Sequence, residues 1–148
     1  MRHSVYFLVI PLMFAPYAWG EWVSVAIDRG SVYLDKDSIK RNGTVVTAKY
    51  VLDLGGKCSS WKENRRGPSK RYCSQIWLTD FDCQRKLFRY QSSITMSGEM
   101  GQGEIVDVRV ITGTTLYGAE FSDVTKFKPN ESTSAAFQLA CQFGGVNR

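Results

Sequence analysis

The chain has 148 residues, with 19 Lys and Arg against 14 Asp and Glu, so its net charge is +5 at neutral pH. Its 43% hydrophobic and 13% aromatic content is typical of a folded protein and argues against intrinsic disorder. The length suits one domain.

Residues 1–20 have the pattern of a secretory signal peptide. A short basic start precedes an apolar run, and the small residues Ala18 and Gly20 stand before an expected cut at Glu21. The run is shorter than the roughly 20 apolar residues that a membrane-spanning helix needs. We therefore expect export to the periplasm, cell surface or medium, and a mature chain of residues 21–148 without a transmembrane segment.

Cleavage would remove His3, the one histidine of the chain. A mature chain without histidine excludes a Ser-His-Asp triad, a Cys-His pair and a His-ligated zinc or haem. It also lacks the commonest general base near neutral pH. We expect a protein that is not an enzyme and needs no cofactor. The remaining enzyme hypothesis uses carboxylates alone.

The first half of the mature chain has β patterns. Residues 22–28 alternate in polarity, and a second short strand is predicted over 31–35. Residues 35–39 resemble one helical turn or a tight bend. Asn42-Gly43 is a strong hairpin signal, and the β-branched, aromatic segment 44–54 predicts a long strand.

Residues 57–74 are rich in Lys, Arg and Ser and contain Gly67-Pro68, a composition that predicts an exposed, basic loop. Trp61 and Tyr72 lie among six cations that face a single acid, Glu63; the cations are Lys57, Lys62, Arg65, Arg66, Lys70 and Arg71. The net charge of this segment equals that of the whole chain. Such a loop is either a solvated surface that aids solubility or an electrostatic site for an anionic partner.

Strand patterns resume after the loop, over residues 75–82, 86–95 and 104–112. Asp80 and Asp82 share one face of the first of these strands, and we interpret them as solvent-facing rather than as catalytic or calcium-binding carboxylates. Met96 and Met100 flank a glycine-rich turn and are interpreted as apolar filler rather than haem contacts. The aromatic residues assigned to the core are Trp22, Trp77, Phe88 and Phe137.

Near the end of the chain, the spacing of apolar residues changes from that of a strand to that of a helix. Ser132 or Thr133 is suited to cap a helix, and Gly144-Gly145 to end it. Between them Phe137 and Cys141 fall on one apolar face. The predicted class is α+β, with an antiparallel sheet of about five or six strands and one packed C-terminal helix.

Four cysteines in an exported chain indicate two disulfides, for which three connectivities exist. We favour a local Cys58–Cys73 bond closing the basic loop and a Cys83–Cys141 bond pinning the helix to the sheet. The other two connectivities stay open on sequence alone. A zinc site is not supported, because no Cys-x-x-Cys occurs.

Several short motifs resemble the surface-adhesin protein E family over nearly all of residues 22–143. They are Trp22-Val23, Tyr33-Leu-Asp35-x-x-Ser38-Ile39, the Gly43 turn, Tyr50-Val-Leu-Asp53, Asp82-Cys83 with Arg85-Lys86, and the helix ending in Cys141. The resemblance implies an antiparallel sheet with a C-terminal helix tethered by Cys83–Cys141. It also implies adhesion to host extracellular-matrix glycoproteins.

Two binding functions follow from these expectations. The first is an adhesin-like module that binds host matrix glycoprotein, sulfated glycan or another anionic partner through Lys62, Arg65, Arg66, Lys70, Arg71, Trp61 and Tyr72. The second is a periplasmic or secreted inhibitor or binding module for another envelope protein, because a stapled loop lowers the cost of binding. A nucleic-acid partner is not expected.

Overall fold

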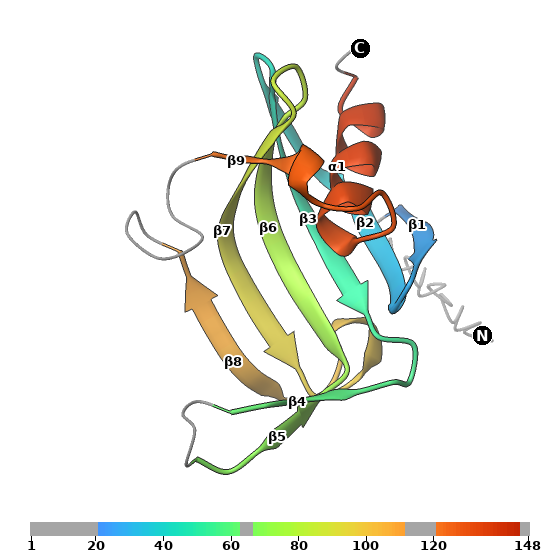
Figure 1. The fold of residues 1–148 in the computed structure, drawn as a ribbon, viewed down its shortest axis with the longest axis vertical. Coiled ribbons are helices and arrows are strands. Elements are labelled where there is room, and N and C mark those ends of the chain that lie inside the picture. Colours follow the sequence, from blue (N-terminus) through green and yellow to red (C-terminus); the bar gives the residue numbers. More distant parts are fainter. Residues whose placement is uncertain (1–20, 63–66, 112–120, 146–148) are drawn as a thin grey trace, which may run out of the picture.

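The computed structural model describes residues 21–62, 67–111 and 121–145 (Figure 1). The expected signal peptide lies outside these ranges. The elements in chain order are β1 (Trp22–Ile27), β2 (Gly30–Asn42), β3 (Val45–Asp53), β4 (Ser59–Trp61), β5 (Lys70–Tyr72), β6 (Ser74–Asp82), β7 (Leu87–Met96), the 3₁₀ turn η1 (Glu99–Gly101), β8 (Ile105–Val110), β9 (Ser122–Asp123), the 3₁₀ turn η2 (Val124–Lys126) and α1 (Ser132–Phe143).

The main sheet is antiparallel throughout and has the order β1-β2-β3-β6-β7-β8, with β9 pairing with β7 as a seventh strand. The α+β class is confirmed, but the predicted five or six strands were too few. The added strand, β9, has two residues, which is too short to show a period of two in the sequence. Strands β4 and β5 form a separate two-stranded sheet.

The helical turn considered for residues 35–39 is wrong, because β2 runs through it to Asn42. The pairing with β3 is interrupted between Asp35 and Lys40, so this segment is a bulge within a strand. Ser38 partly repairs the interrupted ladder: its Oγ accepts from Lys49 N at 2.8 Å and donates to Asp35 O at 2.6 Å.

One face of the sheet carries the core, and α1 lies across it against β2 and β3 (Figure 1). The core residues contributed by the strands include Val32, Leu34, Val46, Ala48, Tyr50, Phe81, Phe88 and Tyr90. Ala136 and Ala140 of the helix are fully buried against them, and Phe137 meets the ring of Phe81 edge-on. Small helix residues let the backbone approach the sheet, and the aromatic rings fill the remaining space.

The helix boundaries match the sequence signals at one end only. α1 ends at Phe143, before Gly144, as predicted. At its start the N-cap is Glu131 rather than Ser132 or Thr133, and no side chain caps the helix. Thr133 is instead buried and hydrogen bonds to the Tyr90 hydroxyl. The Thr133 side chain therefore packs into the core and is not available to cap the helix.

The predicted Cys83–Cys141 disulfide is confirmed and joins the end of β6 to the helix, with 5.6 Å between the Cα atoms. Phe88 lies in the core as predicted, and Trp77 and Phe137 are partly buried against it. Trp22 is not a core residue, because it lies on the edge strand β1 and is 36% exposed.

Asp80 and Asp82 are also placed differently from the prediction, since both carboxylates are buried. Asp80 accepts hydrogen bonds from Thr47 Oγ1 at 2.6 Å, Gln91 Nε2 at 2.6 Å and the Arg89 guanidinium at 2.5 Å. These donors come from β3 and β7, the two strands that flank β6, so together they compensate for loss of hydration.

Asp82 is held by one neighbour along the chain, Arg85, through its backbone N–H at 3.0 Å and its guanidinium Nε at 2.6 Å. Burial alone would raise the pKa of Asp82, but these hydrogen bonds outweigh it and the pKa of Asp82 is lowered. Both carboxylates therefore stabilise the sheet and are not exposed ligands.

Candidate functional site: the basic hairpin

The segment predicted as an exposed loop is a β-hairpin, which we call the basic hairpin (residues 57–62 and 67–73). It is exposed as expected, but β4 and β5 pair antiparallel across it. Trp61 is opposite Lys70, and Ser59 is opposite Tyr72. Because paired residues and residues two apart share a face, Trp61, Lys70 and Tyr72 lie on the same face of this ribbon.

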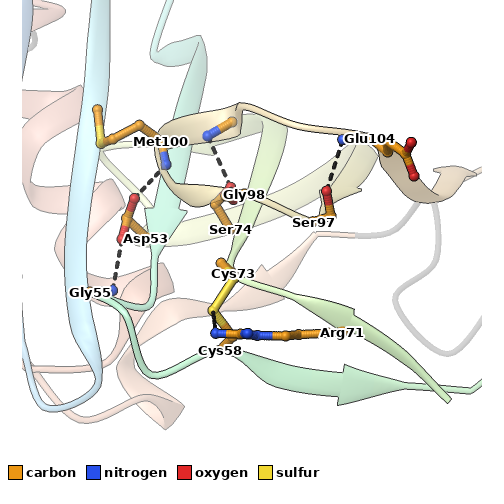
Figure 2. The surroundings of a disulfide bond; sticks show 11 residues. Asp53, Gly55, Cys58, Arg71, Cys73, Ser74, Ser97, Gly98, Met100 and Glu104 are labelled. Carbon is orange, nitrogen blue, oxygen red and sulfur yellow. Dashed lines mark hydrogen bonds between the residues drawn. A yellow bond between two sulfur atoms is a disulfide. The ribbon is translucent and has the colours of Figure 1, made fainter.

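The opposite face of the ribbon carries Arg71 and the disulfide between Cys58 and Cys73. The structure contains this bond, and the Arg71 guanidinium reaches Cys58 Sγ at 3.2 Å (Figure 2). The bond closes the hairpin at its base and leaves one face to the two aromatic rings and a lysine. The ribbon therefore presents an apolar and cationic face on a covalently closed frame.

The base of the hairpin is fixed to the main sheet through Cys73. Its N–H donates to Met96 O and its carbonyl accepts from Leu54 N, each at 3.0 Å. Cys73 itself is buried, at 6% exposure. The hairpin thus projects from the lower end of the sheet in Figure 1 on a rigid attachment rather than on a free loop.

A second structure at this end, the turn η1, lies in the glycine-rich segment that the sequence predicts to be a turn. Met100 adopts a left-handed backbone with φ 52°, which is unusual for a non-glycine residue, and its side chain is 39% exposed. Asp53 accepts from the N–H groups of Met100 and Gly55, and Ser74 donates to Gly98 O at 2.6 Å (Figure 2). The glycine-rich sequence indicated a turn but not the buried carboxylate that holds it.

The basic hairpin carries several exposed cations and no carboxylate in its described part. Lys57, Lys62, Lys70 and Arg71 are exposed, and none of the four forms an ion pair with a described residue. Arg65 and Arg66, which were also predicted to bind a partner, lie outside the described residues. Like charges held this close together produce a positive potential that attracts anions.

Strand β8 adds an apolar surface that the sequence prediction did not include in the site. β8 is the last strand on its side of the main sheet and lies against β5. Ile105, Val108 and Val110 are 61%, 53% and 71% exposed. The sequence predicts a strand over residues 104–112, and the position of β8 at the edge of the sheet accounts for the exposure of these side chains.

The described residues do not assemble a metal centre around the hairpin. No group of three or more His, Cys, Asp or Glu able to hold a metal ion is found in the described part of the chain. Burial raises the pKa of Tyr50 well above its ordinary value, but that hydroxyl lies in the core. The described geometry at this end suits binding.

Comparisons with known proteins point in one direction. The family model of surface-adhesin protein E matches residues 22–142. Two crystal forms of Haemophilus influenzae protein E are similar in structure, with TM-scores of 0.52 and 0.53 at 13% and 14% identity; the matches cover 84% and 82% of this chain and 89% of each protein E chain. Protein E from non-typeable H. influenzae gives 0.50 at 13% identity, covering 82% and 75% of the two chains. No curated protein matches by sequence.

Proposed function

Because the chain belongs to the surface-adhesin protein E family, we propose that it is an exported, non-enzymatic adhesin whose basic hairpin binds a host matrix glycoprotein bearing anionic groups. The observation that carries this proposal is the position of an exposed, cationic hairpin beside an exposed apolar strand. A membrane-spanning helix is not found in the described part of the chain.

The cations of the hairpin would guide and hold the anionic partner. Lys62, Lys70 and Arg71 have no carboxylate partner among the described residues, so binding would not require the breaking of an ion pair there. The affinity of such contacts falls as salt rises, since salt screens the charges. Electrostatic guidance sets the rate of encounter more than the final affinity.

The apolar groups would supply the contact area. Trp61 and Tyr72 are half-buried on one face of the hairpin, and Val108 and Val110 are exposed on the neighbouring strand. Aromatic residues set close to a cation are typical of the residues that dominate protein interfaces. A polysaccharide alone would use the charges but leave the β8 side chains unused, which is why a glycoprotein is favoured.

The test measures binding of residues 21–148 to matrix glycoproteins and to heparin at low and physiological salt. The first variant, Lys70→Ala/Arg71→Ala, removes two hairpin charges. The control variant, Lys40→Ala/Lys126→Ala, removes the same charge from exposed positions on β2 and η2. We expect saturable binding at physiological salt that the first variant loses and the control retains.

A third variant, Val108→Ser/Val110→Ser, separates glycoprotein from glycan. It should weaken binding to the glycoprotein while leaving heparin binding unchanged. Equal binding by the hairpin variant and the control would contradict a role for the hairpin. The alternative, an inhibitor or binding module for an envelope protein, would be supported if the matrix panel fails but an envelope protein binds with dependence on the same hairpin residues.

A further inference from the structure

A pocket of about 460 Å³ lies away from the basic hairpin, where three separate segments meet. They are the β1–β2 turn, the end of β3, and the connection from η2 into α1. The residues that form its wall and floor are Ile27, Asp28, Arg29, Leu52, Leu54, Phe127, Lys128, Asn130, Glu131, Ser132 and Thr133. A volume of this size falls within the range of pockets that hold small molecules.

The floor of the pocket is apolar. Ile27, Leu52, Leu54 and Phe127 are each half-buried and come from three different segments. Phe127 is fixed by an edge-on contact with Phe88, with 5.4 Å between the ring centroids. This surface suits one apolar side chain of moderate size.

The rim combines two cations with two anions. Arg29 and Lys128 face Asp28 and Glu131 around the same opening, and all four side chains are exposed. None of these side chains makes a hydrogen bond or an ion pair with another described residue. Two cations and two anions above an apolar floor suit a ligand that carries both a positive and a negative charge.

The start of α1 reinforces the anionic part of that match. Ser132 and Thr133 line the pocket, no side chain caps the helix, and its first turn has no acidic residue. The free N–H groups of a helix start favour a carboxylate, although alone they define no ligand.

The walls are preformed rather than assembled on binding. Asp28 N donates to Asn130 O at 3.4 Å and Glu131 N donates to Lys128 O at 3.0 Å, so both sides of the rim are tied to the backbone. Gly30, at φ 120°, sits so close to β3 that a Cβ would lie 1.9 Å from Asp53 O. Only glycine fits there, and it sets the position of the turn that carries Asp28 and Arg29.

We propose that this pocket binds a free α-amino acid with a large apolar side chain. The carboxylate would lie between Arg29, Lys128 and the helix start, the ammonium would face Asp28 and Glu131, and the side chain would rest on the Leu52–Phe127 floor. The proposal is independent of the hairpin and of adhesion, because no residue is shared between the two sites.

The test follows backbone amide shifts of ¹⁵N-labelled residues 21–148 as L-phenylalanine or L-leucine is added. Matched probes each lack one feature: N-acetyl-L-phenylalanine lacks the ammonium, L-phenylalaninamide lacks the carboxylate, and glycine lacks the side chain. We expect saturable shifts at Ser132, Thr133 and the β1–β2 turn with the complete ligands. The two probes that lack a charge should each bind at least about tenfold more weakly, the usual value of one hydrogen bond to a charged group. Glycine should also bind at least about tenfold more weakly, because it leaves the apolar floor uncovered.

Two variants place the site. Arg29→Gln should weaken L-phenylalanine binding about tenfold and leave the binding of L-phenylalaninamide unchanged. Asp28→Asn should weaken L-phenylalanine binding by a similar factor and leave the binding of N-acetyl-L-phenylalanine unchanged. Both residues are exposed in a turn, and unchanged amide shifts elsewhere would show that the fold persists. Absence of saturable shifts with the complete ligands, or equal binding by L-phenylalanine and its N-acetyl form, would overturn the proposal.

Discussion

The two disulfides belong to opposite kinds of structure. Cys83–Cys141 joins residues 58 apart in sequence and holds the helix on the core, close to the buried carboxylates Asp80 and Asp82. Cys58–Cys73 joins residues 15 apart and closes a hairpin of three residue pairs that is mostly exposed. The helix end, around Cys83–Cys141, is stabilised by burial. The hairpin end, around Cys58–Cys73, buries little surface and depends on its covalent bond for its shape.

This difference separates the region that stabilises the fold from the region at which we propose that a partner binds. Groups at the helix end are satisfied by one another: Asp80 has donors from the two flanking strands, and Asp82 has Arg85. At the hairpin end the cations have no ion-pair partners among the described residues. The charged groups at the helix end are therefore paired within the fold, whereas the cations at the hairpin end are available to a ligand.

The largest effect is expected from removing the helix disulfide. Cys83→Ala/Cys141→Ala should lower the free energy of unfolding by about 4 kcal/mol, because a long loop of the unfolded chain is released. For Cys58→Ala/Cys73→Ala, the entropy of closing the shorter loop would give a loss of ~3 kcal/mol in the free energy of unfolding. We expect a smaller loss, because the native hairpin would gain freedom along with the unfolded chain. Denaturant unfolding of both variants measures the difference, and equal losses would contradict the distinction between the two ends.

A smaller but still large effect is expected at the buried carboxylate. Asp80→Ala should cost about 3 kcal/mol, because Arg89 and the two neutral donors lose a shared acceptor. The control is Asp107→Ala, which breaks the Asp107–Arg109 pair on the more exposed strand β8 and should cost below about 1 kcal/mol. Similar losses in chemical unfolding would show that burial of Asp80 is unimportant.

The pKa of Asp82 predicts an acid-dependent contribution. Since the pKa of Asp82 is lowered in the fold, its stabilisation is present above the unfolded-state value of about 3.9 and is lost as the pH falls through the lower folded-state value. Asp82→Asn should cost about 1–2 kcal/mol at pH 7 and flatten the dependence of stability on pH below 4.

The smallest effect is expected at the hairpin. Lys70→Ala/Arg71→Ala should change the free energy of unfolding by less than about 0.5 kcal/mol, because both side chains are exposed and the contact of Arg71 with Cys58 Sγ lies at the surface. Paired with a loss of ligand binding, this result would separate the binding role of these cations from folding. A loss above about 1 kcal/mol would instead assign Arg71 a structural role through its contact with Cys58.

Much of the fold was predictable because it depends on local periodicity. The right element types came from the β-branched, aromatic composition of residues 44–54, the alternation along residues 104–112 and the helical spacing of Phe137 and Cys141. Errors arose where a neighbour in space decided the outcome. Residues 35–39 became a bulge because β3 pairs on both sides of it, and Trp22 is exposed because no strand lies beyond β1 in the sheet.

The candidate site was predicted in part. The charge count identified the basic segment, and its polar composition predicted an exposed loop. Neither signal revealed that Trp61, Lys70 and Tyr72 share a face, because that depends on the pairing register of β4 and β5. The contribution of β8 was missed for the same reason, since its exposure follows from its place in the sheet.

The sequence by itself determined the α+β class, the absence of histidine after residue 3, the concentration of positive charge and the apolar face of the helix. These properties depend on composition and on residues a few positions apart. The tertiary structure decided the burial of Asp80 and Asp82, the juxtaposition of the hairpin with β8, and the pocket between Arg29, Leu52 and Lys128. Such features join segments far apart in the chain, and only the packing of the sheet against the helix brings them together.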